Sequence, residues 1–243
     1  MWILLSGEGA TDIGTKTPDP GPITLGLSQI LKDPAWGLGY SFVEYEYYSI
    51  VSEKVLSDTA KAKFKSISST GKKKGKETKY FYKNARALAL LAKEKAQSQG
   101  VQVMPILFRD ADGTVSADRG EWQQKWQSML DGFTAEGIDW GVPVLPKPKS
   151  EAWILCALVR NYQNCGKLEE RSGNDDSPNS LKQELADTLG QQVTRDFLNR
   201  EIKDGRLDFA KIQDMPSFQD CYARLKEAFN ILKDKPTSVQ ADK

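Results

Sequence analysis

The chain has 243 residues, of which 39% are hydrophobic and 28% are charged, a composition typical of a globular protein with a sizeable buried core. Its 34 Lys and Arg nearly balance its 33 Asp and Glu, so the net charge argues neither for nor against a nucleic-acid partner. Histidine is absent. This excludes Ser-His-Asp and Cys-His catalysis, HExxH zinc sites and nucleases that use a histidine base, and leaves chemistry based on carboxylates, lysines, hydroxyls and a hard metal ion.

Segments typical of strands and helices alternate along the first 165 residues. We expect strands at 2–6, 40–51, 101–108 and 140–146, and a Pro/Gly-rich loop at 11–22. We expect helices at 23–33, 79–100, 117–133 and 150–162. This alternation predicts an α/β fold, a parallel sheet of about four strands flanked by helices.

Two further regions interrupt or follow this pattern. Residues 54–79 hold nine lysines against two acidic residues. Nucleic-acid affinity commonly arises when such a run neutralises phosphates, so we expect DNA contact through Lys72, Lys73, Lys74 and Lys76. A solvated insertion fits the same composition. After a polar linker at 166–180, we expect helices at 180–191, 194–202 and 216–233, a helical C-terminal extension (166–243) packed on a catalytic domain (1–165).

The sequence also bears on the compartment. No apolar run approaches the ~20 residues of a membrane span. The N-terminal MWILLSGEG has a short apolar run without a basic flank, so we expect no signal peptide. The three cysteines, Cys156, Cys165 and Cys221, are odd in number and lack CxxC spacing, so we expect reduced thiols in a cytoplasmic protein.

Acidic residues follow three of the four expected strands. In a parallel sheet the loops at the carboxyl ends of the strands meet at one edge, where ligands bind. The acidic residues in these loops are Glu8, Asp12, Asp110, Asp112 and Glu151. Two carboxylates as close as Asp110 and Asp112 repel each other unless a cation or a shared proton compensates. Because Mg²⁺ and Mn²⁺ prefer carboxylate oxygens, we expect a site for one of these ions here.

Simpler structural roles are open for the same residues. Asp12 could cap a helix, and Asp110 and Asp112 could form a solvated acidic turn. Glu151 could interact with a helix dipole from the first turn of the helix at 150–162, with Ser150 as its N-cap. In the functional interpretation, Glu151 completes the metal site and Lys147 neutralises a phosphate oxygen or a leaving group.

The string DADGTV at 110–115 resembles the nucleophile motif of haloacid-dehalogenase-like phosphatases. This resemblance implies that Asp110 attacks phosphorus and that Asp112 acts as acid and base. The motif of that family closes the first strand of the core, whereas two strand–helix units precede Asp110 here. The late acidic pair of the family has only Asp175-Asp176 as its counterpart, with no apolar strand before it, and Glu8 and Asp12 have no role in this interpretation.

The order of the motifs resembles the TOPRIM domain of topoisomerases, primases and nucleases. The resemblance rests on LLSGEGATD with Glu8 after the first strand, and on ILFRDAD with Asp110 and Asp112 after the third. The additional Asp12, and PKPKSEAW after the fourth strand, resemble the nuclease branch, which includes the OLD (overcoming lysogenization defect) nucleases and small stand-alone TOPRIM proteins of bacteria. The resemblance covers about residues 1–165, and no single motif in it is specific.

The resemblance implies metal-dependent hydrolysis of phosphodiester bonds by a two-metal mechanism. Asp110 and Asp112 would bind Mg²⁺ or Mn²⁺ together with Asp12, and Glu8 would be a ligand or a general acid and base. Glu151 and Lys147 match a more variable part of the motif. OLD-type nucleases are coupled to an ATPase, and no Gly-Lys-Ser/Thr follows the glycines near Glu8. The analogy therefore predicts a separate ATPase partner, in a setting such as phage defence. A non-catalytic subunit that binds nucleic acid or a partner is a further alternative.

Overall fold

The computed structural model describes residues 1–64, 75–111, 119–158 and 164–235, excluding the side chains of 75–77 and 119–121. Its centre is a four-stranded, wholly parallel sheet, as predicted. The strands in spatial order are β4 (Tyr48–Val51), β1 (Trp2–Gly7), β5 (Val103–Phe108) and β6 (Val142–Val144). β5 and β6 are buried at every position, which explains their continuous apolar sequences.

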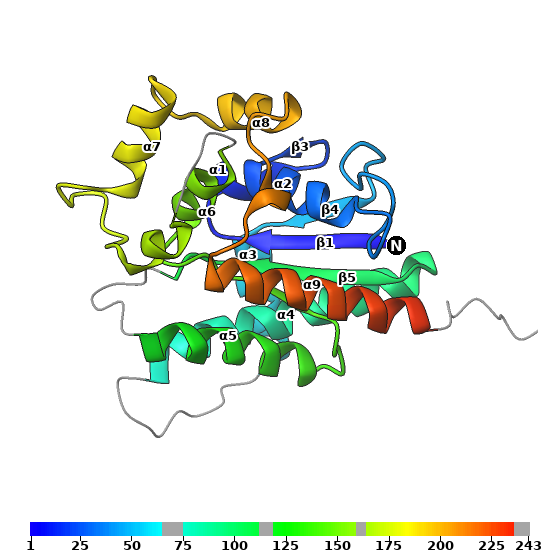
Figure 1. Cartoon of the computed structure of the whole chain (residues 1–243). Helices are drawn as coiled ribbons and strands as arrows, with labels where there is room; N and C mark the ends of the chain where they lie inside the picture. Colours follow the sequence, from blue (N-terminus) through cyan, green and yellow to red (C-terminus); the bar gives the residue numbers. More distant parts are fainter. Residues whose placement is uncertain (65–74, 112–118, 159–163, 236–243) are drawn as a thin grey trace, which may run out of the picture.

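Helices cover both faces of the sheet (Figure 1). One face carries α2 (Pro22–Leu31), α6 (Ser150–Ala157) and α9 (Pro216–Asp234), and the other α3 (Glu53–Lys63), α4 (Gly75–Gln99) and α5 (Arg119–Thr134). Alternate side chains of each strand point to opposite faces. Ile3 and Leu5 therefore belong to the first hydrophobic cluster, whereas Leu4 belongs to the second.

The connections reverse direction between β1 and β5. The chain passes from β1 through α2 to β4 at one edge, and then through α3 and α4 back past β1 to β5. It continues through α5 to β6 at the other edge. Because parallel crossovers are right-handed, the two directions place their helices on opposite faces. The carboxyl ends of β1 and β5 thus flank the switch point where open α/β sheets bind ligands.

Three expected elements have different bounds. The aromatic segment 40–51 contributes only β4 to the sheet, because the preceding residues turn: Ser41 Oγ accepts the Glu44 N–H, and Glu46 has a φ of 55°. The expected loop 11–22 contains part of a short helix, α1 (Ala10–Ile13), and a hairpin of β2 (Gly14–Lys16) and β3 (Asp19–Pro20). The expected helix 150–162 is α6, which ends at Ala157, and residues 159–163 lie outside the described ranges.

The C-terminal extension shares one hydrophobic cluster with the first face of the sheet. Its elements are η1 (Cys165–Glu170), α7 (Leu181–Leu189), α8 (Arg195–Lys203), η2 (Phe209–Lys211) and α9. The N-caps Ser180 and Thr194 accept backbone N–H groups of α7 and α8. Trp153 of α6 is 1% exposed, packs edge-on against Phe218 and donates its indole N–H to Ser217 Oγ.

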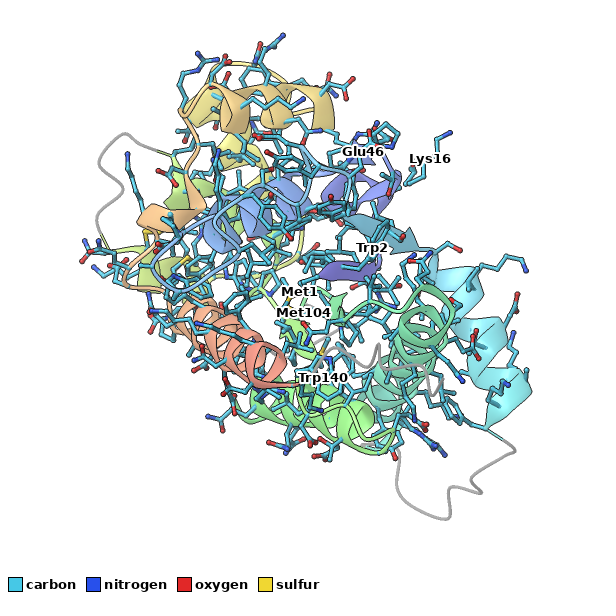
Figure 2. The ribbon with its side chains drawn as sticks, turned by 90° about the vertical axis from the view of Figure 1, so that its right-hand side faces the viewer. Met1, Trp2, Lys16, Glu46, Met104 and Trp140 are labelled. Atoms are coloured by element: carbon cyan, nitrogen blue, oxygen red, sulfur yellow. A yellow bond between two sulfur atoms is a disulfide. The ribbon has the colours of Figure 1, made fainter. Side chains whose placement is uncertain are left out.

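The amino-terminal edge of the sheet is covered by aromatic and cationic side chains. Trp2, Met104 and Trp140 lie where β1, β5 and β6 begin (Figure 2). The Lys95 ammonium lies 4.2 Å from the Trp2 ring centre, and that of Lys235 lies 3.4 Å from the Trp140 ring centre. The carboxyl edge, where α1 and α6 lie beyond the arrowhead of β1 in Figure 1, carries four of the predicted acidic residues: Glu8, Asp12, Asp110 and Glu151. Within the described ranges, no helix combines the length and apolar character needed to cross a membrane.

Candidate metal and active site

Glu8 and Asp110 meet at the switch point between β1 and β5. The two strands pair up to Gly7 and Phe108, so the residues that follow continue side by side. The Asp110 N–H donates a hydrogen bond to Glu8 Oε1 at 3.2 Å. A Cβ at Gly7 would lie 2.9 Å from Phe108 Cδ1, so glycine is required for this close approach. The structure thus brings together two acidic residues that are far apart in sequence.

Ser150, the first residue of α6, joins two of the predicted carboxylates. Its backbone N–H donates to Asp110 Oδ1 at 2.9 Å, and its hydroxyl donates to Asp12 Oδ1 at 2.6 Å. The same hydroxyl lies 3.4 Å from Glu151 Oε2. The prediction that Ser150 is the N-cap of this helix is wrong, because Lys149 occupies the N-cap position and the Ser150 hydroxyl bonds to the neighbouring Asp12.

The electrostatic environment of Asp12 favours a cation. Burial raises the pKa of Asp12 to about 6 and outweighs the hydrogen bond from Ser150, which lowers it. The negative charges of Glu151 and Glu8 raise this pKa further, and Lys149 opposes them. Three carboxylates therefore act on one another in a partly buried place. Their oxygen donors are those that Mg²⁺ and Mn²⁺ prefer, so these residues fit a divalent cation.

The carboxylates do not form a closed cage. In the described part of the chain, the only group with three possible ligand atoms within 4.8 Å of one another is Cys156, Cys165 and Asp214. Glu8, Asp12 and Asp110 are therefore more widely spaced than that. Mg²⁺ usually keeps several of its waters and takes only one or two protein carboxylates, so wider spacing suits it.

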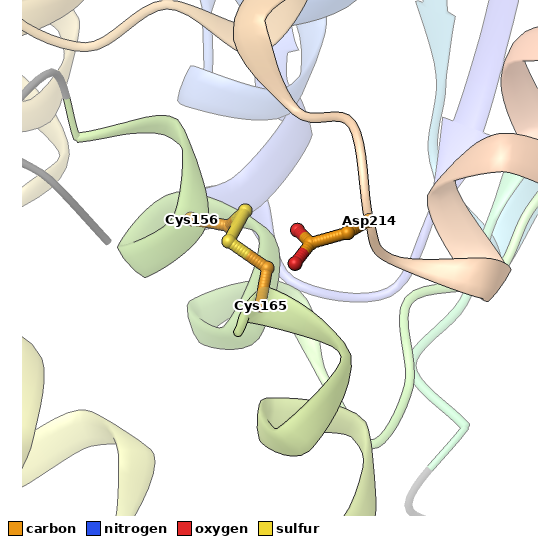
Figure 3. A group of neighbouring side chains, drawn as sticks. All are labelled: Cys156, Cys165 and Asp214. Carbon is orange, nitrogen blue, oxygen red and sulfur yellow. A yellow bond between two sulfur atoms is a disulfide. The ribbon is translucent and has the colours of Figure 1, made fainter. Parts of the chain in front are cut away.

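The Cys156, Cys165 and Asp214 group is not a metal site in this structure (Figure 3). Cys156 and Cys165 form a disulfide with Cα atoms 5.6 Å apart, and only the Cys221 thiol is free. A metal-binding cysteine must be a thiolate, which a disulfide cannot provide. The expectation of three reduced thiols is thus wrong for two of them, because α6 ends at Ala157 and the chain returns to bring Cys165 beside Cys156.

The lysine beside the carboxylates is Lys149. Its Nζ lies 4.0 Å from Glu151 Oε2 and forms an ion pair with Asp175, whose pKa it holds below the usual range. Lys147 acts elsewhere. Burial raises the pKa of Glu169, and the hydrogen bonds from Ser217 and the charge of Lys147 counteract this effect. Of the two lysines, Lys149 is the one that contacts a predicted carboxylate, and the role of Lys147 at a phosphate stays a prediction.

Several predicted residues cannot be placed. Asp112 and three of the lysines, Lys72, Lys73 and Lys74, lie outside the described ranges. Lys76 belongs to α4, but its side chain is not described. The first half of the Lys-rich segment is not a solvated insertion, because it forms α3 and buries Leu56 in the core of the second face.

Two basic residues next to Asp110 were not predicted. Arg109 is fully buried and donates from Nη1 to the Phe108 carbonyl at 2.9 Å. Lys125, which is 2% exposed, donates to the Ala111 carbonyl at 2.9 Å and so supports the backbone directly after Asp110 from α5. The signal for Arg109 is present in the sequence FRDAD, where a basic residue directly follows a strand buried on both faces.

No family model, curated protein or solved structure matches this chain.

Proposed function

We propose that this protein is a divalent-metal-dependent nuclease that hydrolyses phosphodiester bonds, most readily those of DNA. The observation that carries the proposal is the double hydrogen bond of Ser150, which holds Asp110 and Asp12 together beside Glu8 and Glu151. These carboxylates come from loops after three different strands and meet at the switch point, the usual ligand site of an open α/β sheet.

The residues have distinct roles in this proposal. Asp110 and Asp12 would hold the ion, Glu8 and Glu151 would complete its surroundings, and Asp112 would be the further ligand that the TOPRIM resemblance implies. When bound, Mg²⁺ or Mn²⁺ supplies Lewis acidity for water activation and for stabilising the leaving oxygen. Ser150 orients Asp110 and Asp12 and therefore acts as a positioning residue. In a chain without histidine, Glu8 is the carboxylate best suited to accept the proton of the attacking water, because the Asp110 N–H fixes its Oε1.

A phosphatase with Asp110 as nucleophile is the second candidate. One contact favours it: the ion pair with Lys149 brings Asp175, the late acidic residue of that family pattern, next to Glu151. Against it, Asp175 follows no strand of the described sheet. The phosphatase also gives no role to Asp12, although Asp12 shares the Ser150 contacts with Asp110. The nuclease assigns a role to Glu8, Asp12, Asp110 and Glu151, the carboxylates that follow the strands.

A cytoplasmic location and a separate ATPase partner are part of the proposal by analogy. The Cys156–Cys165 disulfide argues against a reducing cytoplasm, where such bonds are rare. A nuclease that works with an ATPase would show weak cleavage alone and stronger cleavage in the complex.

A DNA cleavage assay tests the proposal. Plasmid and linear DNA are incubated with the protein and Mg²⁺ or Mn²⁺, with EDTA as the blank. The wild type is compared with Asp110→Asn and Glu8→Gln, which keep side-chain size but remove the charge. Loss of one catalytic carboxylate is expected to reduce cleavage by at least about 100-fold. Glu94→Gln, at an exposed position of α4, is the matched control.

The two candidates predict different results. A nuclease cleaves DNA and requires Glu8, whereas a phosphatase hydrolyses a small phosphate ester and tolerates Glu8→Gln. A phosphatase would also form a trapped aspartyl phosphate mimic at Asp110. Absence of cleavage together with absence of Mn²⁺ binding would refute the nuclease proposal for this chain.

A further inference from the structure

A groove with a volume of about 600 Å³ lies between α3 and α4, on the second face of the sheet. One side of α3 lines it with Glu53, Lys54 and Lys61, which recur at helical spacing. α4 lines it with Tyr80, Lys83 and Asn84. Glu53 directly follows β4 through Ser52, so this end of the groove opens at the carboxyl edge of the sheet that carries Asp110.

The groove is positively charged. Three lysines line it against one carboxylate, Glu53. Lys54 is paired with Asp58 at 2.6 Å, but Lys61 and Lys83 have no ion pair or hydrogen bond with any residue in the described ranges. Two ammonium groups are thus available to an anion that enters the groove.

Buried hydrogen-bond donors of two residues, the neutral Asn84 and the cationic Arg109, lie at or behind the groove. Asn84, which is 4% exposed, lines the groove beside Tyr80. Its Nδ2 makes no hydrogen bond of ordinary geometry in the described part of the chain, and its side chain interacts with the Tyr80 hydroxyl, where it opposes the rise in the Tyr80 pKa that burial causes. The Nε and Nη2 atoms of the fully buried Arg109 likewise make no hydrogen bond there. A buried donor without a partner costs about 1–3 kcal/mol, so such donors call for a partner, and an anion or ordered water in the groove would supply one.

Arg109 connects the groove to the candidate site. Its Nη2 lies 3.9 Å from Glu53 Oε1, and its guanidinium carbon lies 5.4 Å from the centre of the Tyr80 ring. Tyr80 in turn donates a hydrogen bond to Glu53. The guanidinium of Arg109 therefore lies directly behind Glu53 and Tyr80, which line the groove. Glu53 is half exposed, so its carboxylate compensates the buried charge of Arg109 only weakly.

We propose that this groove binds phosphate groups of a nucleic-acid strand as it leaves the carboxylate site. The inference rests on the proposed nuclease function and names a second contact region for its substrate. From Glu53 to Lys61 α3 rises about 12 Å, at about 1.5 Å per residue. Each DNA strand carries one phosphate per about 3.4 Å of helix axis, so the groove spans more than one phosphate.

Binding without cleavage tests this inference. Anisotropy of a fluorescent oligonucleotide, single-stranded or duplex, is measured in EDTA across a range of salt concentrations. The double variant Lys61→Gln/Lys83→Gln is expected to bind at least about tenfold more weakly near 0.1 M salt. The slope of log affinity against log salt is expected to fall by about 2, one for each lost phosphate contact.

The matched control is Lys203→Gln/Lys233→Gln, which removes the same charge from exposed positions at the ends of α8 and α9. Its affinity is expected to stay within about twofold of the wild type, because it lies outside the groove. Equal losses in both double variants, or no loss in the groove variant, would overturn the inference. The inference would also be overturned if the protein binds inorganic phosphate or a mononucleotide through Lys61 and Lys83 but does not bind the oligonucleotide. That result would indicate a small ligand.

Asn84→Leu gives a second, independent readout. Leucine has the same branched outline, although it is bulkier than asparagine, and it removes the buried donor, so the melting temperature is expected to be kept or to rise slightly. Oligonucleotide affinity is expected to fall in the same variant, which a loss of folding would not explain. A more stable variant with unchanged affinity would contradict a ligand role for Asn84.

The failures of the two proposals can be distinguished. If oligonucleotide binding depends on Lys61 and Lys83 but no metal supports cleavage, the groove assignment stands and the nuclease proposal fails. If the wild type cleaves DNA and the groove variant binds and cleaves equally well, the nuclease proposal stands and the groove assignment fails.

Discussion

The backbone N–H of Ser150 donates a 2.9 Å hydrogen bond to Asp110 Oδ1, across 40 residues of sequence. This contact ties the first turn of α6 to the end of β5. Since the Ser150 hydroxyl also bonds Asp12, one residue orients carboxylates that follow two different strands. Its small side chain and its position at a helix start, where N–H groups lack intrahelical partners, make both bonds possible.

Ser150→Ala is expected to weaken Mn²⁺ binding by about 10- to 100-fold, the usual effect of removing a residue that orients a metal ligand. The backbone bond to Asp110 remains, so the loss reports mainly on Asp12, with a smaller contribution from the 3.4 Å contact to Glu151. Ser150→Thr keeps the hydroxyl and is expected to retain most of the affinity. Isothermal titration calorimetry of the metal-free protein measures both variants, and equal affinity for Ala and wild type would show that Ser150 does not position a ligand.

Glu169 makes the stability depend on pH. This carboxyl is 5% exposed and accepts the Ser217 N–H at 2.7 Å, and burial raises its pKa. The folded state therefore binds its proton more tightly than the unfolded state, so the stability falls as pH rises from the ordinary carboxyl pKa through the raised one. Glu169→Gln is expected to remove this part of the pH dependence. At neutral pH, its free energy of unfolding is expected to exceed that of the wild type.

Urea unfolding at pH 4.5 and pH 7.5 measures the effect. The control for Glu169→Gln is Glu94→Gln, at an exposed position, which is expected to change the stability by less than about 0.5 kcal/mol at both pH values. If the free energy of unfolding falls by the same amount from pH 4.5 to pH 7.5 in the wild type and in Glu169→Gln, the Glu169 carboxyl does not cause the pH dependence.

The cysteine pairing predicts one free thiol out of three. Ellman's reagent is expected to detect Cys221 only after denaturation, because burial raises its pKa and keeps the folded thiol protonated and inaccessible. Reduction is expected to destabilise the protein by up to about 3 kcal/mol, since the disulfide closes a short loop. Three thiols in the denatured, non-reduced protein would contradict the pairing and favour the reducing compartment expected from the sequence.

Trp153→Ala is expected to destabilise the protein by about 3–5 kcal/mol, because this side chain fills the shared core between α6 and the C-terminal extension. Tyr45→Ala is the aromatic control: it is 59% exposed, and its expected cost is below about 1 kcal/mol. Thermal unfolding followed by circular dichroism compares the two. A small effect of Trp153→Ala would mean that the extension contributes little to the core.

Much of the fold follows from local sequence. The apolar runs that end at Phe108 and Val144 are continuous, so both faces of these strands must be buried. Burial on both faces is typical of parallel strands with helical crossovers. Chain order then places Glu8, Asp110 and Glu151 at one edge, whatever the details of packing. The segment before Tyr48 shows the limit of this reasoning, because its aromatic residues have strand propensity and yet form turns held by Ser41.

The amino-acid sequence by itself determined the architecture and the edge where the acidic residues gather, because hydrophobic periodicity and the handedness of crossovers are properties of the chain order. Only the tertiary structure decided which groups touch. It placed Ser150 between Asp12 and Asp110, brought Lys149 beside Glu151, joined Cys156 to Cys165, and set the buried Arg109 behind the groove between α3 and α4. Such contacts depend on the directions of side chains from segments far apart in sequence, which no local pattern encodes.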